Sequence, residues 1–136
     1  MEKELTLRVY YADTDAQGVV YHANYLRFFE SARTEYLRAL GIELSELVKD
    51  QGVQFAVVEL NIKYHKPAYL DDKLLLVSRI SKIGYSSVIY QQEIYQTDRS
   101  GILLCNAEVR LVTVDVNMRP CVVPKILPKI LNGEIK

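Results

Sequence analysis

The sequence predicts an α+β domain in which a five-stranded antiparallel sheet wraps around one long helix. Apolar residues alternate with period two in five segments, whereas only the segment near 22–40 repeats them every three to four positions. The last four strand segments are joined by short connections that leave no room for helical crossovers, so we expect antiparallel neighbours. A strand of about nine residues spans roughly 30 Å, which matches a helix of about 18 residues. With 136 residues, we expect 1–136 to form a single domain.

The composition argues against several classes of protein. Lys plus Arg and Asp plus Glu number 17 each, so the chain lacks the basic surplus that nucleic-acid binding requires. No apolar run is long enough to span a bilayer, and the charged N-terminus lacks the apolar core of a signal peptide. We therefore expect a cytoplasmic protein. Cys105 and Cys121 are too few for a disulfide framework, and Cys and His do not cluster, so we expect no metal site.

The N-terminal half of the chain contains a strand, a polar loop and the long helix. Residues 4–12 alternate, with Leu5 to Tyr11 on one face, and the Asp-Thr-Asp run that follows favours a turn. The helix is predicted over about 22–40, and Gly41 is its expected left-handed C-cap. Its apolar stripe consists of Tyr25, Phe28, Phe29, Ala32, Tyr36, Ala39 and Leu40.

A short second helix is predicted over 44–49 and is ended by Gly52. The later strands are predicted over 58–65, 74–80, 88–94 and 103–111. The turns are expected at 67–72, 82–84 and 98–101, and one short helical turn is expected within 124–131. In the strand over 58–65, the residues expected to face inward are Val58, Leu60, Ile62 and Tyr64. In the strand over 103–111, they are Leu103, Cys105, Ala107, Val109 and Leu111. Apolar Leu104, Val112 and Val114 on the other face of the last strand indicate a partly covered outer surface, which another subunit could provide.

Residues 10–25 combine carboxylates with the start of the long helix. Asp13 and Asp15 would share one face of an extended segment, and Gly18 would allow a positive φ angle or a close backbone approach. Free N–H groups at the helix N-terminus can stabilise a developing oxyanion, so this arrangement suits acyl chemistry. An Asp before a helix is often only a cap, but Asp15 lies about two turns too early for that. His22 could polarise a carbonyl or simply pack at the helix start, and the residues alone leave both readings open.

The run R-V-Y-Y-A-D-T-D-A-Q-G-V-V-Y-H-A-N-Y, followed by E-S-A-R-T-E-Y-L-R, closely resembles the opening of hotdog-fold acyl-CoA thioesterases. The resemblance is to the 4-hydroxybenzoyl-CoA thioesterase type and, within it, the YbgC-like (Tol–Pal-associated) group. The segments K-Y-H-K-P-A-Y-L-D-D and N-A-E-V-R-L-V-T-V-D also fit, so the similarity covers nearly the whole chain. It implies one hotdog thioesterase domain over 1–136, with five antiparallel strands around a central helix.

The resemblance also implies a function and a site. It implies hydrolysis of acyl-CoA to a carboxylic acid and CoA, without cofactor or metal, in a homodimer or homotetramer with active sites at subunit interfaces. It places the catalytic aspartate on Asp15 and the carbonyl-polarising amide near His22, which itself matches the histidine of the YbgC-like group. The substrate-binding and supporting positions it implies are Asp13, Gly18, Val20, Tyr21 and Asn24.

Several alternatives stay open at the level of sequence. One is a non-hydrolytic module on the same fold that binds acyl-CoA or an acyl-carrier protein. Another is a hotdog dehydratase, which needs a different His and acid pairing with the acid on the helix. The sequence does not decide the acyl preference, nor whether Asp15 acts as nucleophile or as general base.

Overall fold

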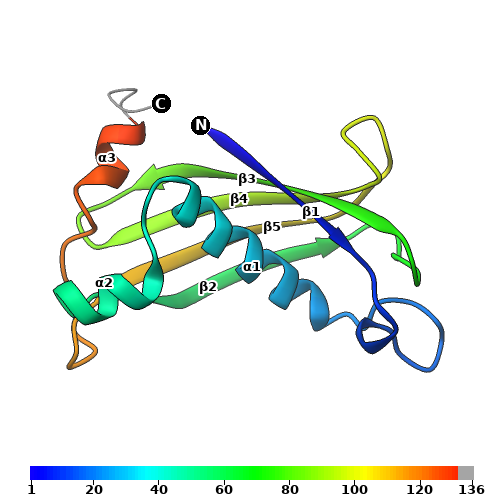
Figure 1. The fold of residues 1–136 in the computed structure, drawn as a ribbon, viewed down its shortest axis with the longest axis horizontal. Coiled ribbons are helices and arrows are strands. Elements are labelled where there is room, and N and C mark those ends of the chain that lie inside the picture. Colours follow the sequence, from blue (N-terminus) through cyan, green and yellow to red (C-terminus); the bar gives the residue numbers. More distant parts are fainter. Residues whose placement is uncertain (132–136) are drawn as a thin grey trace.

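The computed structural model describes residues 1–131 and shows one antiparallel sheet with three helices in that part of the chain. The strands lie in the order β1-β3-β4-β5-β2, and α1 crosses one face of the sheet (Figure 1). The predicted fold class is therefore confirmed. The elements are β1 (Glu2–Arg8), η1 (Tyr11–Asp13), α1 (Asn24–Ala39), α2 (Leu44–Gln51), β2 (Gln54–Tyr64), β3 (Lys73–Ile83), β4 (Ser87–Gln96), β5 (Leu103–Val114) and α3 (Ile126–Leu131).

The first strand is shorter than predicted. It ends at Arg8, because Tyr11–Asp13 forms a tight 3-10 turn in which the Asp13 carboxylate accepts the Tyr10 N–H. This turn breaks the alternation, so Tyr11, which was expected to face inward, is exposed. Val9 remains fully buried as predicted.

Helix α1 fills the concave face of the sheet with aromatic side chains. Its buried residues are Tyr25, Phe28, Phe29, Ala32, Tyr36 and Leu37. The prediction was wrong at Ala39, which is exposed at the end of the helix, while Leu37 is buried. Gly41 has a φ of 83° and ends the helix as expected. The left-handed Gly52 likewise ends α2.

The open side of the molecule lies along β2. This strand is at one edge of the sheet, and α1 packs against β1 and β3 at the other side, so the inner face of β2 is only partly covered. A β-bulge between Val57 and Glu59 shifts the alternation, which makes the predicted inward position of Val58 wrong. Val57 and Val58 are each 52% exposed.

Strand β5 and helix α3 bury further apolar side chains in the core. A register irregularity between Ile94 and Tyr95 buries Leu104 in place of Leu103, which was predicted to face inward. Leu104 and Val114 are buried by this chain itself, and Val112 is half-buried. Helix α3 forms within the segment where a short helical turn was predicted, and it contributes Leu127 and Ile130 to the core.

The remaining turns follow the prediction with one shift. Strand β3 continues to Ile83, with a bulge between Ile80 and Lys82, so its turn begins at Gly84 rather than at 82. The connection at 98–101 joins β4 to β5, as expected. Within residues 1–131, no helix is both long and apolar enough to cross a membrane.

Candidate active site

Asp15 lies at the base of a small hairpin between η1 and α1. Its N–H donates to the Val19 carbonyl at 2.9 Å, and its carbonyl accepts the Gly18 N–H at 3.0 Å. Thr14 and Val20 form an isolated bridge that closes this loop. Gly18 has a φ of 80°, a left-handed conformation that side chains with a Cβ rarely adopt. The glycine therefore permits the tight turn that presents Asp15.

The Asp15 carboxylate has one free oxygen. The side chain is half-buried, and its Oδ1 accepts the Gln17 N–H at 2.8 Å. Within residues 1–131, Oδ2 has no hydrogen-bond partner. A carboxylate held at one oxygen and free at the other is oriented yet still able to attack a carbonyl or accept a proton.

Asp13 has a different environment, because it is buried and fully engaged. Its Oδ2 accepts the Tyr10 N–H at 2.8 Å, and its Oδ1 pairs with the Arg27 guanidinium of α1. Its carbonyl accepts the Asn24 side-chain amide at 2.8 Å and the Tyr21 N–H at 3.0 Å. Asp13 therefore ties the loop to the first turn of α1. Since η1 is a turn rather than an extended segment, the two carboxylates have separate partners.

The N-terminus of α1 offers unpaired backbone donors. The helix begins at Asn24, and Ala23 provides no side-chain cap. In the part of the chain that the structure describes, the N–H groups of His22 and Ala23 have no acceptor. These groups lie at the positive end of the helix dipole, where a negatively charged oxygen is stabilised.

His22 borders a cavity of about 260 Å³ at this helix terminus. Val20, Tyr25 and Tyr64 also line it. The Tyr64 hydroxyl donates to the His22 carbonyl at 2.8 Å, and the rings of Tyr25 and Tyr64 meet edge to face at 5.3 Å. Burial raises the pKa of both tyrosines, so both stay neutral hydroxyls at physiological pH. The exposed Tyr21 ring packs beside the His22 ring, with the two ring centroids 4.6 Å apart.

The structure thus brings only part of the predicted site together within one chain. His22 and Val20 line the cavity, Tyr21 flanks it, and Asp13 and Asn24 brace the loop behind it. Asp15 is in the adjoining hairpin and does not line this cavity.

Sequence reasoning missed two residues at this site. It treated Tyr64 only as an inward strand residue, although Tyr64 fixes the helix start from β2. It gave Arg27 no role at the site, although Arg27 pairs with Asp13. Both interactions join segments 14 to 42 positions apart, and alternation and helical periodicity carry no signal for such contacts. Among residues 1–131, no group of three or more His, Cys, Asp and Glu could hold a metal ion.

A five-stranded antiparallel sheet wrapped around one long helix defines an α+β domain of the hotdog type. Residues 17–103 match the family model described as the thioesterase superfamily. The chain therefore belongs to the thioesterase superfamily, which confirms the predicted family and the predicted class of enzyme, a thioester hydrolase.

Relatives and solved structures agree with this family. The chain is 42% identical over 120 residues to the acyl-CoA thioesterase YbgC of Haemophilus influenzae, which covers 88% of this chain and 86% of the relative. A probable thioesterase from Bartonella henselae has 32% identity and a TM-score of 0.85, covering 91% of this chain and all of that one. A 1,4-dihydroxy-2-naphthoyl-CoA thioesterase from Synechocystis shares the fold over both full chains, with a TM-score of 0.90 at 23% identity.

Proposed function

We propose that this protein hydrolyses acyl-CoA thioesters to a carboxylic acid and free CoA. The observation that carries the proposal is the free Oδ2 of Asp15, in a hairpin that leads directly to the unpaired N–H groups of His22 and Ala23. The YbgC relative from Haemophilus influenzae is named as an acyl-CoA thioesterase, and a 42% identical relative from Escherichia coli as an acyl-CoA thioester hydrolase. Both names support CoA as the carrier of the acyl group.

In the proposed mechanism, Asp15 attacks the thioester carbonyl to form a mixed anhydride that water then hydrolyses, or it takes a proton from the water that attacks the carbonyl. The backbone N–H groups at the start of α1 stabilise the oxyanion that forms. The leaving thiol has a pKa of roughly 8.5, as for a free cysteine, so it departs as thiolate without a strong general acid. One carboxylate and a few donors are therefore sufficient, and no step needs a metal or a cofactor.

The proposal includes a second copy of the chain. Asp15 does not line the cavity beside His22, and the outer edge of β2 carries exposed apolar side chains. A dimer or tetramer in which a partner completes the cavity would supply the missing wall and cover this edge. The cytoplasmic location stays a prediction.

The proposal is tested by measuring thiol release from short, medium and long aliphatic acyl-CoAs and from an aromatic acyl-CoA. We expect turnover of at least one of them, well above the rate without enzyme. The principal alternative is a module that binds acyl-CoA without hydrolysing it. Saturable binding of several acyl-CoAs with no thiol release from any of them would favour that module and contradict the proposal.

The role of the His22 side chain is tested separately with His22→Ala, which keeps the backbone N–H. If the imidazole takes part in the reaction, kcat falls by about 100-fold or more, with an unchanged circular dichroism spectrum. An unchanged kcat would assign the contribution of this position to its backbone alone.

A further inference from the structure

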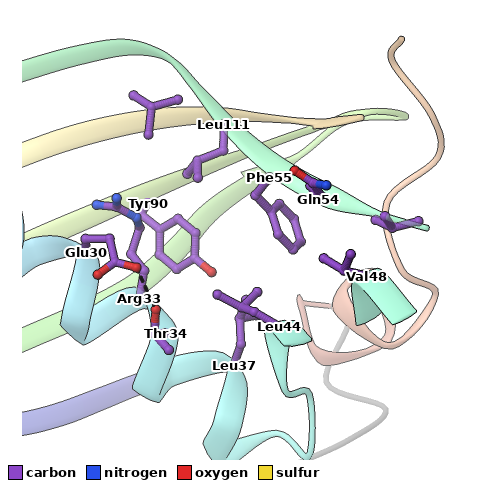
Figure 2. A pocket seen from close by; sticks show the side chains of 12 residues that line it. Glu30, Arg33, Thr34, Leu37, Leu44, Val48, Gln54, Phe55, Tyr90 and Leu111 are labelled. Carbon is purple, nitrogen blue, oxygen red and sulfur yellow. Dashed lines mark hydrogen bonds between the residues drawn. The ribbon is translucent and has the colours of Figure 1, made fainter. Parts of the chain in front are cut away.

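A second cavity, of about 280 Å³, opens on the inner face of the sheet between α1, α2 and β2 (Figure 2). Its walls are mainly apolar and include Leu37, Leu44, Val48 and Phe55. Arg33 and Tyr90 reach it from α1 and β4. Arg33 is nine positions beyond Asn24, which is about 13 Å along the helix axis. The cavity is therefore separate from the one beside His22, although both use α1 and β2.

Tyr90 brings an unpartnered hydroxyl group into this apolar space. The residue is only 2% exposed, and its hydroxyl points toward the space between Leu37 and Phe55 (Figure 2). No hydrogen bond joins this hydroxyl to any residue in 1–131. Burial raises its pKa, so it is a neutral donor. Because this hydroxyl opens onto the cavity, it is free to donate to an acceptor on a bound ligand.

Arg33 brings a positive charge that forms no direct ion pair with the residues the structure describes. Its guanidinium donates to the Gln92 Oε1 at 3.1 Å, and none of the carboxylates in residues 1–131 lies within ion-pair distance of it. The Glu30 carboxylate also lines the cavity, where it accepts the Thr34 hydroxyl at 3.0 Å and stays outside ion-pair distance of Arg33. A partly buried guanidinium with a single neutral acceptor has further N–H donors to satisfy.

Gln92 holds the guanidinium in this position. It is 1% exposed, and its Nε2 donates to the Phe29 carbonyl at 3.0 Å and to the Ser78 hydroxyl at 2.9 Å. These two bonds fix the orientation of the amide, so Oε1 must face Arg33. The site is therefore organised by buried polar groups on α1, β3 and β4.

We propose that this cavity binds a carboxylate attached to an apolar chain, with the carboxylate between Arg33 and Tyr90 and the chain against the apolar walls. An arginine and a hydroxyl are donors suited to a carboxylate. Such a carboxylate has two sources. One is a free monocarboxylic acid, which is the class of product that thioester hydrolysis releases. The other is the far end of a long dicarboxylic acyl group, and this source rests on the proposed function.

The cavity is tested by calorimetric titration of the purified protein with octanoate and with octan-1-ol. We expect octanoate to bind at least about tenfold more tightly than the alcohol. Arg33→Met and Tyr90→Phe should each weaken octanoate binding, Arg33→Met by about tenfold or more. The matched controls Arg110→Met and Tyr85→Phe, at exposed positions outside the cavity, should bind like the wild type.

The two sources are separated by activity measurements. If a long ω-carboxyacyl group is the source, the wild type should hydrolyse the ω-carboxyacyl-CoA faster than the acyl-CoA of equal length without the terminal carboxylate. Arg33→Met should lose this preference. Equal hydrolysis of both, with inhibition by octanoate that Arg33→Met removes, would support the free acid. Absence of hydrolysis with every thioester would contradict the proposed function. The calorimetric titration would still show whether the cavity binds a carboxylate.

Two results would overturn the inference. One is equal or undetectable binding of octanoate and octan-1-ol to the wild type. The other is an Arg33→Met variant that keeps its octanoate affinity, because the carboxylate would then not be bound by Arg33.

Discussion

Asp13 and Asp15 are two positions apart, and their surroundings differ in every respect that matters for chemistry. Asp13 is buried, and both of its carboxylate oxygens are occupied by Tyr10 and Arg27. Asp15 is half-buried and keeps one oxygen free. A free, oriented carboxylate can react, whereas a saturated one serves to hold the loop. At the residue scale the two aspartates therefore have distinct expected roles.

This division predicts how the Asp13–Arg27 pair contributes to stability. Asp13→Ala removes a buried carboxylate and leaves the part-buried Tyr10 N–H without its charged acceptor, so it should lower the free energy of unfolding by about 1–3 kcal/mol. Arg27→Met should cost less than about 1 kcal/mol, since more than half of the Arg27 side chain is exposed and its ion pair is screened by solvent. Urea unfolding of both variants checks this order. A larger loss for Arg27→Met would show that the ion pair, not the Tyr10 bond, holds the turn.

At the scale of elements, the start of α1 is positioned by three segments. The η1 turn reaches it through Asp13, the loop before β3 through Ala68, whose N–H donates to the Tyr25 hydroxyl at 3.1 Å, and β2 through Tyr64. The Tyr64 bond is the one that links an edge strand to the proposed oxyanion donors. A change in β2 should therefore affect the reaction without any direct contact with the thioester.

Tyr64→Phe tests this link, because it removes only the hydroxyl that donates to the His22 carbonyl. We expect the free energy of unfolding to fall by about 0.5–1.5 kcal/mol. We also expect kcat to fall while the KM for acyl-CoA changes little, since the donors at the helix start are less firmly held. Tyr85→Phe, at a position 78% exposed, is the control. A variant with reduced stability but unchanged kcat would limit Tyr64 to a structural role.

The element order and most inward faces could be predicted from periodicity, because alternation and the helical stripe report local burial. The errors fall where a single irregularity shifts the pattern. The η1 turn exposes Tyr11, and the bulge after Val57 moves the inward face of β2. The D-T-D loop and its expected residues could be named from the sequence, but the partners of Asp13 could not. Its partners Asn24 and Arg27 come from α1, 11 and 14 positions further along the chain, and no local pattern encodes such a contact.

At the scale of the whole molecule, strand β2 offers an exposed sheet edge for contact with another copy of the chain. Val57, Val58 and Leu60 are exposed on this strand, and the cavities beside His22 and Arg33 both use its inner face. A long apolar edge strand is a template for pairing with another chain. Pairing here would cover the edge and enclose both cavities.

We therefore predict that the protein is a dimer or tetramer of its 15.6 kDa chain and that Val57→Lys/Leu60→Lys shifts it toward the monomer. Light scattering coupled to size exclusion measures the mass directly. Val122→Lys, a substitution at a position 50% exposed outside β2, serves as the control and should leave the mass unchanged. A monomeric wild type, or a double variant that assembles normally, would contradict this prediction.

The most direct test of the account is the turnover of Asp15→Asn on the best acyl-CoA substrate. The amide keeps an oxygen that can accept the Gln17 N–H, so the hairpin should persist, while the nucleophile or base is lost. We predict a fall in kcat of at least about 100-fold, with a melting temperature close to that of the wild type. Asp50→Asn, at an exposed position on α2, should retain full activity. Equal turnover by Asp15→Asn and the wild type would show that Asp15 does not carry the reaction.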